Sequence, residues 1–288
     1  MGTDIILEKQ HTAVIPKGVV ESKLKASSYQ MDIIAILLAE IGKATDKDEN
    51  LEYSLSAEMF SNLKKDISKH EAAKVLRKYI CGNLDSNDES MRHIGFEVWI
   101  DKENFRHYNW FEKIFYENGV ATFYLTPDIK QFLVDFKKHD QMKIYAKLRY
   151  ILPMRSRYSK RIYLMCREFI GSGTRFCDTD WDLFKEKLQI PSSYNYFKIK
   201  NNILESAKKE INEFSDIEID YTISETLDKG GQRPTAIKFT IKKKFDDTEE
   251  TQTKQEVIEA AENKSVEDIE EQIKQLSALL EKKKAEQK

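Results

Sequence analysis

The chain has little cysteine and no long apolar run. Its 288 residues include three cysteines, Cys81, Cys166 and Cys177, whose spacing suits neither a disulfide framework nor a zinc site. No apolar run reaches the ~18 residues of a membrane span, and no secretory leader opens the chain. We therefore expect a protein of the reducing cytoplasm that contacts no membrane.

Sequence patterns that carry catalysis are also missing. There is no Gly-x-x-x-x-Gly-Lys-[Ser/Thr] loop for a nucleoside triphosphate. The five histidines are scattered, and none forms a His-x-His or His-Glu-x-x-His unit that would hold a catalytic metal. The glycine-rich stretch at 171–174 follows an expected helix and precedes a strand, the reverse of a phosphate loop, so we interpret it as a helix terminator. We predict that the protein is not an enzyme and uses no cofactor or metal.

The net charge of -2 conceals a strong segregation along the chain. Residues 1–141 carry 19 Lys and Arg against 23 Asp and Glu, residues 142–244 carry 21 against 13, and residues 245–288 carry 7 against 13. The three segments therefore have charges of -4, +8 and -6. The basic segment makes residues 142–244 a candidate for contact with nucleic acid, and the winged-helix order of the same residues, described below, strengthens this interpretation.

Residues 25–141 show the element order of a winged helix. Helical spacing of apolar residues and capping serines alternate with short β patterns, and Asn118-Gly119 is typical of a hairpin turn. The expected elements are a helix from Ser27 or Ser28 to about Lys43, a strand at Leu51–Leu55, helices beginning at Ser56 and Ser68, strands at Phe96–Ile100, Trp110–Tyr116 and Val120–Leu125, and a helix from Thr126-Pro127.

Residues 142–244 repeat the same order. A connecting helix is expected at Gln141–Leu152, ending before Pro153. The elements that follow are a helix around Ile162–Phe169, a strand at Thr174–Cys177, a helix capped by Asp178 or Thr179, a long helix at Ser193–Phe214, and strands at Ile217–Ile223 and Thr235–Ile241 joined through Thr226–Pro234.

The predicted fold class is α+β, with two tandem winged-helix domains at 25–141 and 142–244. Residues 1–24 are expected to form a loose N-terminal arm, with Pro16 and Gly18 as breakers. Residues 245–288 are expected to form an acidic, partly disordered tail with one amphipathic helix at Val266–Lys284.

The long helix of the second unit is the candidate base-reading element. Its apolar side is expected to hold Phe197, Ile199, Ile203, Leu204, Ala207 and Ile211, which leaves an outward set of Asn195, Lys198, Asn201 and Asn202. Asn pairs bidentately with adenine. Because two adjacent Asn are poor helix formers, their presence favours a function.

Basic residues around this helix are candidate phosphate contacts, which set the register on DNA without reading its sequence. A solvated helix start is the alternative interpretation, and Arg161 is also a candidate partner of Glu168 or Asp182. The predicted set is Arg155, Arg157, Lys160, Arg161, Lys200, Lys229 and Arg233 in the second unit, with Lys74, Arg77 and Lys78 in the first.

The strands of the first unit are unusually aromatic. Alternation does not bury all of these rings in one small domain, so a protein interface is expected, with Tyr108, Trp110 and Phe115 as its candidate residues. The alternative is that the rings form the core and pack the domains together.

Several of these segments resemble one known family, the replication initiators of iteron-bearing, theta-replicating plasmids. The resemblance covers about residues 25–244 and rests on the order and spacing of its motifs. These are Tyr158-Ser159-x-Arg161-x-Tyr163, Leu188-x-Ile190-Pro191-x-x-Tyr194, Phe197-x-Ile199-Lys200-x-x-Ile203-Leu204, Ala207-x-x-Glu210-Ile211-Asn212, Ile237-x-Phe239-x-Ile241, and Phe111-Glu-Lys-Ile-Phe-Tyr followed by Gly119 and Leu125-Thr126.

The resemblance implies a bacterial initiator with two winged helices. The second unit would bind one end of a directly repeated iteron, while the first would bind the other end in the monomer and form the dimer otherwise. It also implies that dimers repress their own gene, and that monomers open the origin and recruit a host initiator and helicase. Asn201-Asn202 departs from the basic residues that relatives often carry, which indicates A·T-rich iterons, and the acidic tail has no clear counterpart.

Two other functions remain open from the sequence. A winged-helix transcription regulator would share the DNA-binding helix but should lack the duplicated unit. A structural or adaptor protein would use the winged helices and the tail for protein contacts, and should show no salt-dependent affinity for DNA.

Overall fold

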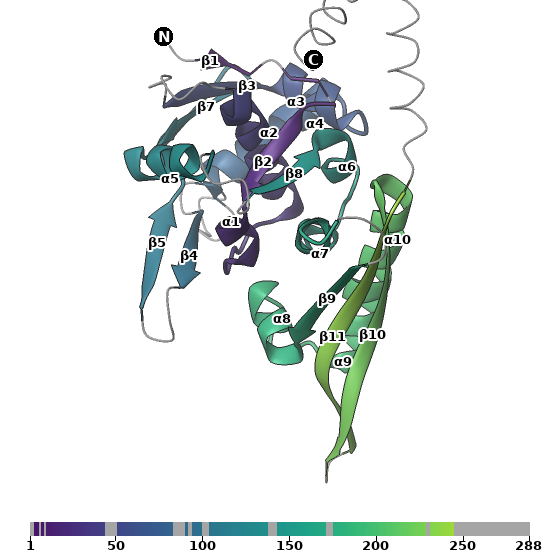
Figure 1. The fold of residues 1–288 in the computed structure, drawn as a ribbon. Coiled ribbons are helices and arrows are strands. Elements are labelled where there is room, and N and C mark those ends of the chain that lie inside the picture. Colours follow the sequence, from purple (N-terminus) through teal and green to yellow (C-terminus); the bar gives the residue numbers. More distant parts are fainter. Residues whose placement is uncertain are drawn as a thin grey trace, which may run out of the picture. The chain divides into compact units, whose positions relative to one another are not determined.

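A computed structural model describes residues 3–5, 7–8, 10–43, 51–82, 90–91, 94–99, 104–137, 143–170, 175–228 and 231–244 (Figure 1). The acidic tail at 245–288, the glycine-rich stretch at 171–174 and Lys229 lie outside these ranges. The predictions made for them therefore stay predictions.

The first winged-helix unit has the element order that the sequence predicts. Its four-stranded sheet has the order β1-β3-β7-β6, and a separate antiparallel pair, β4 with β5, was not foreseen as two strands. The elements are α2 (Ser28–Lys43), β3 (Glu52–Ser56), α3 (Ala57–Lys64), α4 (Lys69–Cys81), β4 (Gly95–Trp99), β5 (Phe105–Asn109), β6 (Phe111–Glu117), β7 (Val120–Leu125) and α5 (Pro127–Lys137).

Short-range hydrogen bonds explain where these elements begin. The Ser56 hydroxyl accepts the Met59 N–H at the start of α3. Ser68 and Glu71 form a reciprocal capping box at the start of α4, which satisfies two backbone donors that the first helical turn leaves without partners. Asn118 and Gly119 have φ of 49° and 82°, as the two-residue turn between β6 and β7 requires.

The expectation of a loose arm at the N-terminus is wrong for the described residues, because they form β1 (Thr3–Asp4), β2 (Thr12–Pro16) and α1 (Lys17–Glu21). The connecting helix predicted at Gln141–Leu152 is also wrong in its first half, which forms β8 (Lys143–Lys147). β2 and β8 pair antiparallel. Alternate residues of both strands are buried. This two-residue period is that of a strand and not that of the predicted helix.

The second winged-helix unit follows α6 (Leu148–Ile151) and contains one three-stranded antiparallel sheet in the order β10-β11-β9. Figure 1 shows α9 and α10 running beside the long β10–β11 hairpin. Its elements are α7 (Arg157–Arg167), β9 (Arg175–Asp180), α8 (Trp181–Lys187), α9 (Tyr196–Ile199), the π-helical segment η4 (Lys200–Glu205), α10 (Ser206–Phe214), β10 (Ile217–Asp228) and β11 (Gly231–Lys243).

Two details of this unit differ from the prediction. Asp180, rather than Asp178 or Thr179, caps α8 by accepting the Leu183 N–H. Most of the expected turn at Thr226–Pro234 is paired strand, in which Thr226 lies opposite Arg233. The hairpin is therefore a long wing with a short tip.

Candidate nucleic-acid interface

The long helix of the second unit is continuous through α9, η4 and α10. Ile199, Ile203, Leu204, Ala207 and Ile211 are buried, as predicted, while Asn201 and Asn202 are exposed. The helix therefore anchors one apolar side in the domain core and presents two adjacent amides to solvent.

Both amides lie in η4, where the backbone hydrogen bonds follow the π pattern. π-Helical turns inside α-helices are rare and frequently mark functional sites. At the end of this segment the Tyr221 hydroxyl of β10 donates to a Glu205 carboxylate oxygen at 2.5 Å. Burial and the Glu205 charge raise the pKa of Tyr221. This hydrogen bond links the amide-bearing segment to the wing strand.

Asn195 has a different role from the one predicted. It is the N-cap of α9, and its side-chain oxygen accepts the Lys198 N–H at 3.0 Å. A bidentate contact to adenine needs both the oxygen and the NH₂ group of Asn. Because the cap already uses one lone pair of this oxygen and holds the amide against the backbone, Asn195 is a weaker candidate for that contact than Asn201 or Asn202.

The two lysines of this helix differ in exposure. Lys198 is exposed and lies over the Tyr194 ring, with Nζ 5.8 Å from the ring centroid. Lys200 is half-buried, which agrees with its expected position between the buried and exposed sides. Of these two lysines, Lys198 is thus the one that is exposed like Asn201 and Asn202.

Two of the predicted phosphate contacts are buried and serve the fold instead. Lys160 is fully buried and donates to Asp32, while Lys64 Nζ lies 3.0 Å from the other Asp32 oxygen in an ion pair without hydrogen-bond geometry. Arg161 is 4% exposed and donates to the backbone oxygens of Val20, Ser22 and Lys187. Neither cation is available to DNA, and Arg161 pairs with neither acidic side chain proposed for it.

The neighbouring arginines remain candidates. Arg155 is exposed, and its backbone N–H donates to a Glu210 carboxylate oxygen at 3.2 Å. This bond holds the backbone just before α7 but does not involve the guanidinium. Arg157 is half-buried and donates to the Gln189 carbonyl at 3.2 Å. Arg155 is therefore the better candidate of the two for a phosphate contact.

The wing places Arg233 on the exposed surface of β11. The pKa of Asp182 in α8 is lowered, first by a hydrogen bond from Lys185 and to a smaller degree by the charge of Arg233. Arg233 thus lies near the start of α8.

The first unit also presents basic residues. Lys74, Arg77 and Lys78 are exposed on α4, and Lys78 Nζ lies 5.2 Å from the centroid of the Tyr79 ring. All three side chains are therefore accessible from solvent.

The three aromatic residues predicted to form a dimer interface differ in how far they are exposed. Trp110 is fully buried, so it belongs to the core and is not an interface residue. Tyr108 is half-buried and stacks on Phe96 with ring centroids 5.4 Å apart. Phe115 is 48% exposed on β6, the edge strand of its sheet, and only this ring is substantially available to a partner.

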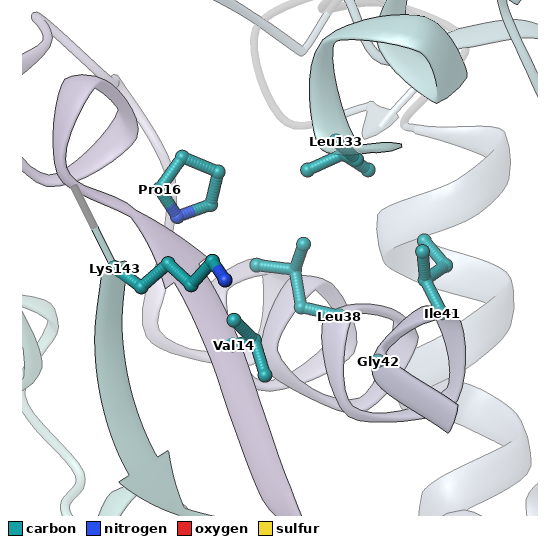
Figure 2. A pocket seen from close by; sticks show the side chains of 7 residues that line it. All are labelled: Val14, Pro16, Leu38, Ile41, Gly42, Leu133 and Lys143. Carbon is teal, nitrogen blue, oxygen red and sulfur yellow. The ribbon is translucent and has the colours of Figure 1, made fainter. Parts of the chain in front are cut away.

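The hollow between β2, α2 and α5 is too small for a ligand. Figure 2 shows side chains that line this hollow, among them Val14, Pro16, Leu38 and Lys143. Its volume is about 10 Å³. Such a space holds about one water molecule.

The described ranges contain no group of three or more His, Cys, Asp or Glu side chains placed to bind a metal. Within the same part of the chain, none of the helices combines the length and apolar character needed to cross a membrane.

The fold and this surface define a tandem winged-helix protein. Residues 14–167 match the family model described as "Initiator Replication protein, WH1", and residues 180–241 match "Initiator Rep protein, WH2". The chain therefore belongs to the replication initiator protein family.

Comparison with solved structures supports the same fold. The crystal structure of Pi initiator protein in complex with iteron DNA aligns with a TM-score of 0.63 and 16% sequence identity, over 83% of this chain and 100% of that chain. No curated protein matches this chain in a sequence comparison.

Phe197 is the residue of this surface that the sequence interpretation misplaced. Helical spacing from Ile199 and Ile203 assigned it to the buried side, but it is 71% exposed. One signal in the sequence was available. Asn195 is a residue type that favours N-caps, and an N-cap at Asn195 places Phe197 in the first turn of the helix, before the turns that pack on the core.

Proposed function

We propose that this initiator binds directly repeated iteron DNA at a plasmid origin through the long helix of its second unit. The observation that carries the proposal is the exposed Asn201-Asn202 pair on a helix whose other side is anchored in the core. Recognition helices of this kind enter the major groove, where Asn recognises adenine. This amide pair implies that the iterons are A·T-rich.

Exposed arginines supply the sequence-independent part of binding. Arg155 lies at the start of the second unit and Arg233 on the wing, and both are proposed to neutralise phosphates on either side of the helix. In the first unit, α4 with Lys74 and Arg77 would contact phosphates farther along the repeat. We retain 25–141 and 142–244 as the proposed domain bounds.

The same protein is proposed to exchange between monomer and homodimer. β6 is an edge strand that carries exposed Phe115, and an edge strand has backbone groups open to pairing with another chain. In this proposal the dimer represses its own gene, and the monomer opens the origin and recruits a host initiator and helicase in the bacterial cytoplasm. The protein acts by binding and has no catalytic step of its own.

A replication assay tests the proposal. DNA from upstream of the coding gene would be the only origin on a selectable plasmid, and the protein would be supplied from a second replicon. Transformants are expected with wild type and not with an Asn201→Ala, Asn202→Ala double variant of equal abundance. Efficient replication without any protein supplied would contradict the proposal.

A further inference from the structure

Phe197 exposes more of its side chain than any other large apolar residue in the described part of the chain. It is 71% exposed, whereas the next most exposed, Phe105, is 49% exposed. Single exposed apolar residues are common on proteins. This one is notable for its position, in the first turn of the helix that carries the candidate base contacts.

The ring is oriented by its neighbours but is not part of the core. Tyr196 contacts it edge to face, with centroids 6.1 Å apart, and Tyr196 itself packs on Trp181 at 6.0 Å. Tyr196 is among the half-buried residues packed against the core, whereas Phe197 is not. The fold therefore does not need the Phe197 side chain, but its aromatic neighbour limits where the ring points.

The position of Phe197 relative to Asn201 matters for recognition. The two residues are four apart, and such residues are neighbours on a helix surface. The first residues of a recognition helix contact base edges in the major groove. Phe197 and Asn201 would thus reach the same or adjacent base pairs.

The thymine 5-methyl group is the apolar feature that the major groove offers, and Phe is one of the side chains that contact it. We propose that Phe197 packs against the methyl group of a thymine within the iteron, next to the adenine that Asn201 recognises. This inference rests on the proposed function. It names Phe197 as a specificity-determining residue that distinguishes thymine from the other bases at one position.

The test removes the methyl group from the DNA and the ring from the protein. The probe is a fluorescent duplex with one repeat from the upstream DNA, in which each thymine in turn is replaced by deoxyuridine. Binding is measured by anisotropy for wild type, Phe197→Ala and Phe197→Leu. Phe105→Ala is the control, because it removes a ring of the first unit that is 49% exposed and has no proposed role in binding.

We expect one thymine whose replacement weakens wild-type binding roughly four-fold, the contribution of about one buried methyl-sized group. Phe197→Ala should bind the unmodified repeat more weakly and should show no further loss at that thymine. Phe197→Leu should keep part of the methyl sensitivity, and Phe105→Ala should behave like wild type. Circular dichroism melting should show all variants folded, since both rings are exposed.

The outcomes separate this inference from the proposed function. If wild type prefers the repeat over a shuffled duplex but no deoxyuridine weakens binding, or if Phe197→Ala keeps the full methyl sensitivity, the Phe197 inference is overturned and iteron binding stands. If wild type shows no preference for the repeat, iteron binding fails and the inference fails with it.

Discussion

Replacing Asp32 by Asn tests the buried ion cluster that holds α7 against the first unit. Asp32 in α2 is fully buried and contacts both Lys160 of α7 and Lys64 of α3. Lys160 also donates to the backbone and hydroxyl oxygens of Ser28, at 3.0 and 2.7 Å. Asn keeps the shape of Asp but removes the negative charge that two buried ammonium groups share.

The expected loss of free energy of unfolding follows from this uncompensated charge. Removing one partner of a buried ion pair costs about 3–5 kcal/mol, because the remaining charge stays in a poorly solvated site. We expect Asp32→Asn to lower the free energy of unfolding by about 4 kcal/mol. Asp220→Asn is the matched control, since Asp220 is 67% exposed and pairs with Lys208 at the surface, where such a pair contributes at most about 1 kcal/mol.

The buried ion cluster should also make the free energy of unfolding depend on pH. Burial, opposed by the attraction of Asp32, lowers the pKa of Lys160 from 10.5 to about 8. Between these values the unfolded chain holds the proton that the folded chain has released, so this group makes stability rise with pH in that window. Lys160→Met removes the titrating group and leaves Asp32 paired with Lys64.

Urea unfolding followed by circular dichroism between pH 7 and pH 10 measures both effects. From pH 8 to pH 10, the stability of wild type relative to Lys160→Met should rise by about 2 kcal/mol, from the shift in the Lys160 pKa. A loss below about 1 kcal/mol in Asp32→Asn, or a relative stability that falls across this pH range, would refute the argument that the cluster is a buried and charged contact.

The other predictions concern DNA and self-association. Asn201→Ala and Asn202→Ala should each weaken binding to the specific repeat by about 1–3 kcal/mol and hardly affect random DNA; equal losses on both DNAs would mean that these amides do not specify sequence. Arg155→Ala and Arg233→Ala should each reduce the salt dependence of binding by about one counterion, and unchanged slopes in titrations at several salt concentrations would remove them from the interface. Phe115→Lys should shift the protein toward monomer in sedimentation velocity, whereas a dimer as stable as wild type would exclude β6 as the interface.

Much of the fold could be predicted because its signals are local. Capping serines, the Asn118-Gly119 turn and apolar periodicity lie within a few residues of the elements they define. β8 was missed because its partner, β2, lies more than a hundred residues away in the sequence. A five-residue strand stabilised by such a distant segment gives little local indication of its pairing.

The candidate site was harder to predict because residue type does not determine burial. Lys160 and Arg161 have the composition of a phosphate-binding cluster, but Asp32 and the carbonyls of Val20 and Ser22 give them buried partners more than a hundred residues away. The exposure of Asn201 and Asn202 was predicted correctly, because it follows from the helical period of the apolar residues beside them.

Footprinting tests the central claim most directly. Wild type and the Asn201→Ala, Asn202→Ala double variant would be titrated on DNA from upstream of the coding gene and probed with DNase I. Wild type should protect several direct repeats in the same orientation, and the double variant should fail to protect them at equal concentration. Protection of a single inverted repeat would instead indicate a repressor, and equal protection by the double variant would contradict base recognition by the long helix.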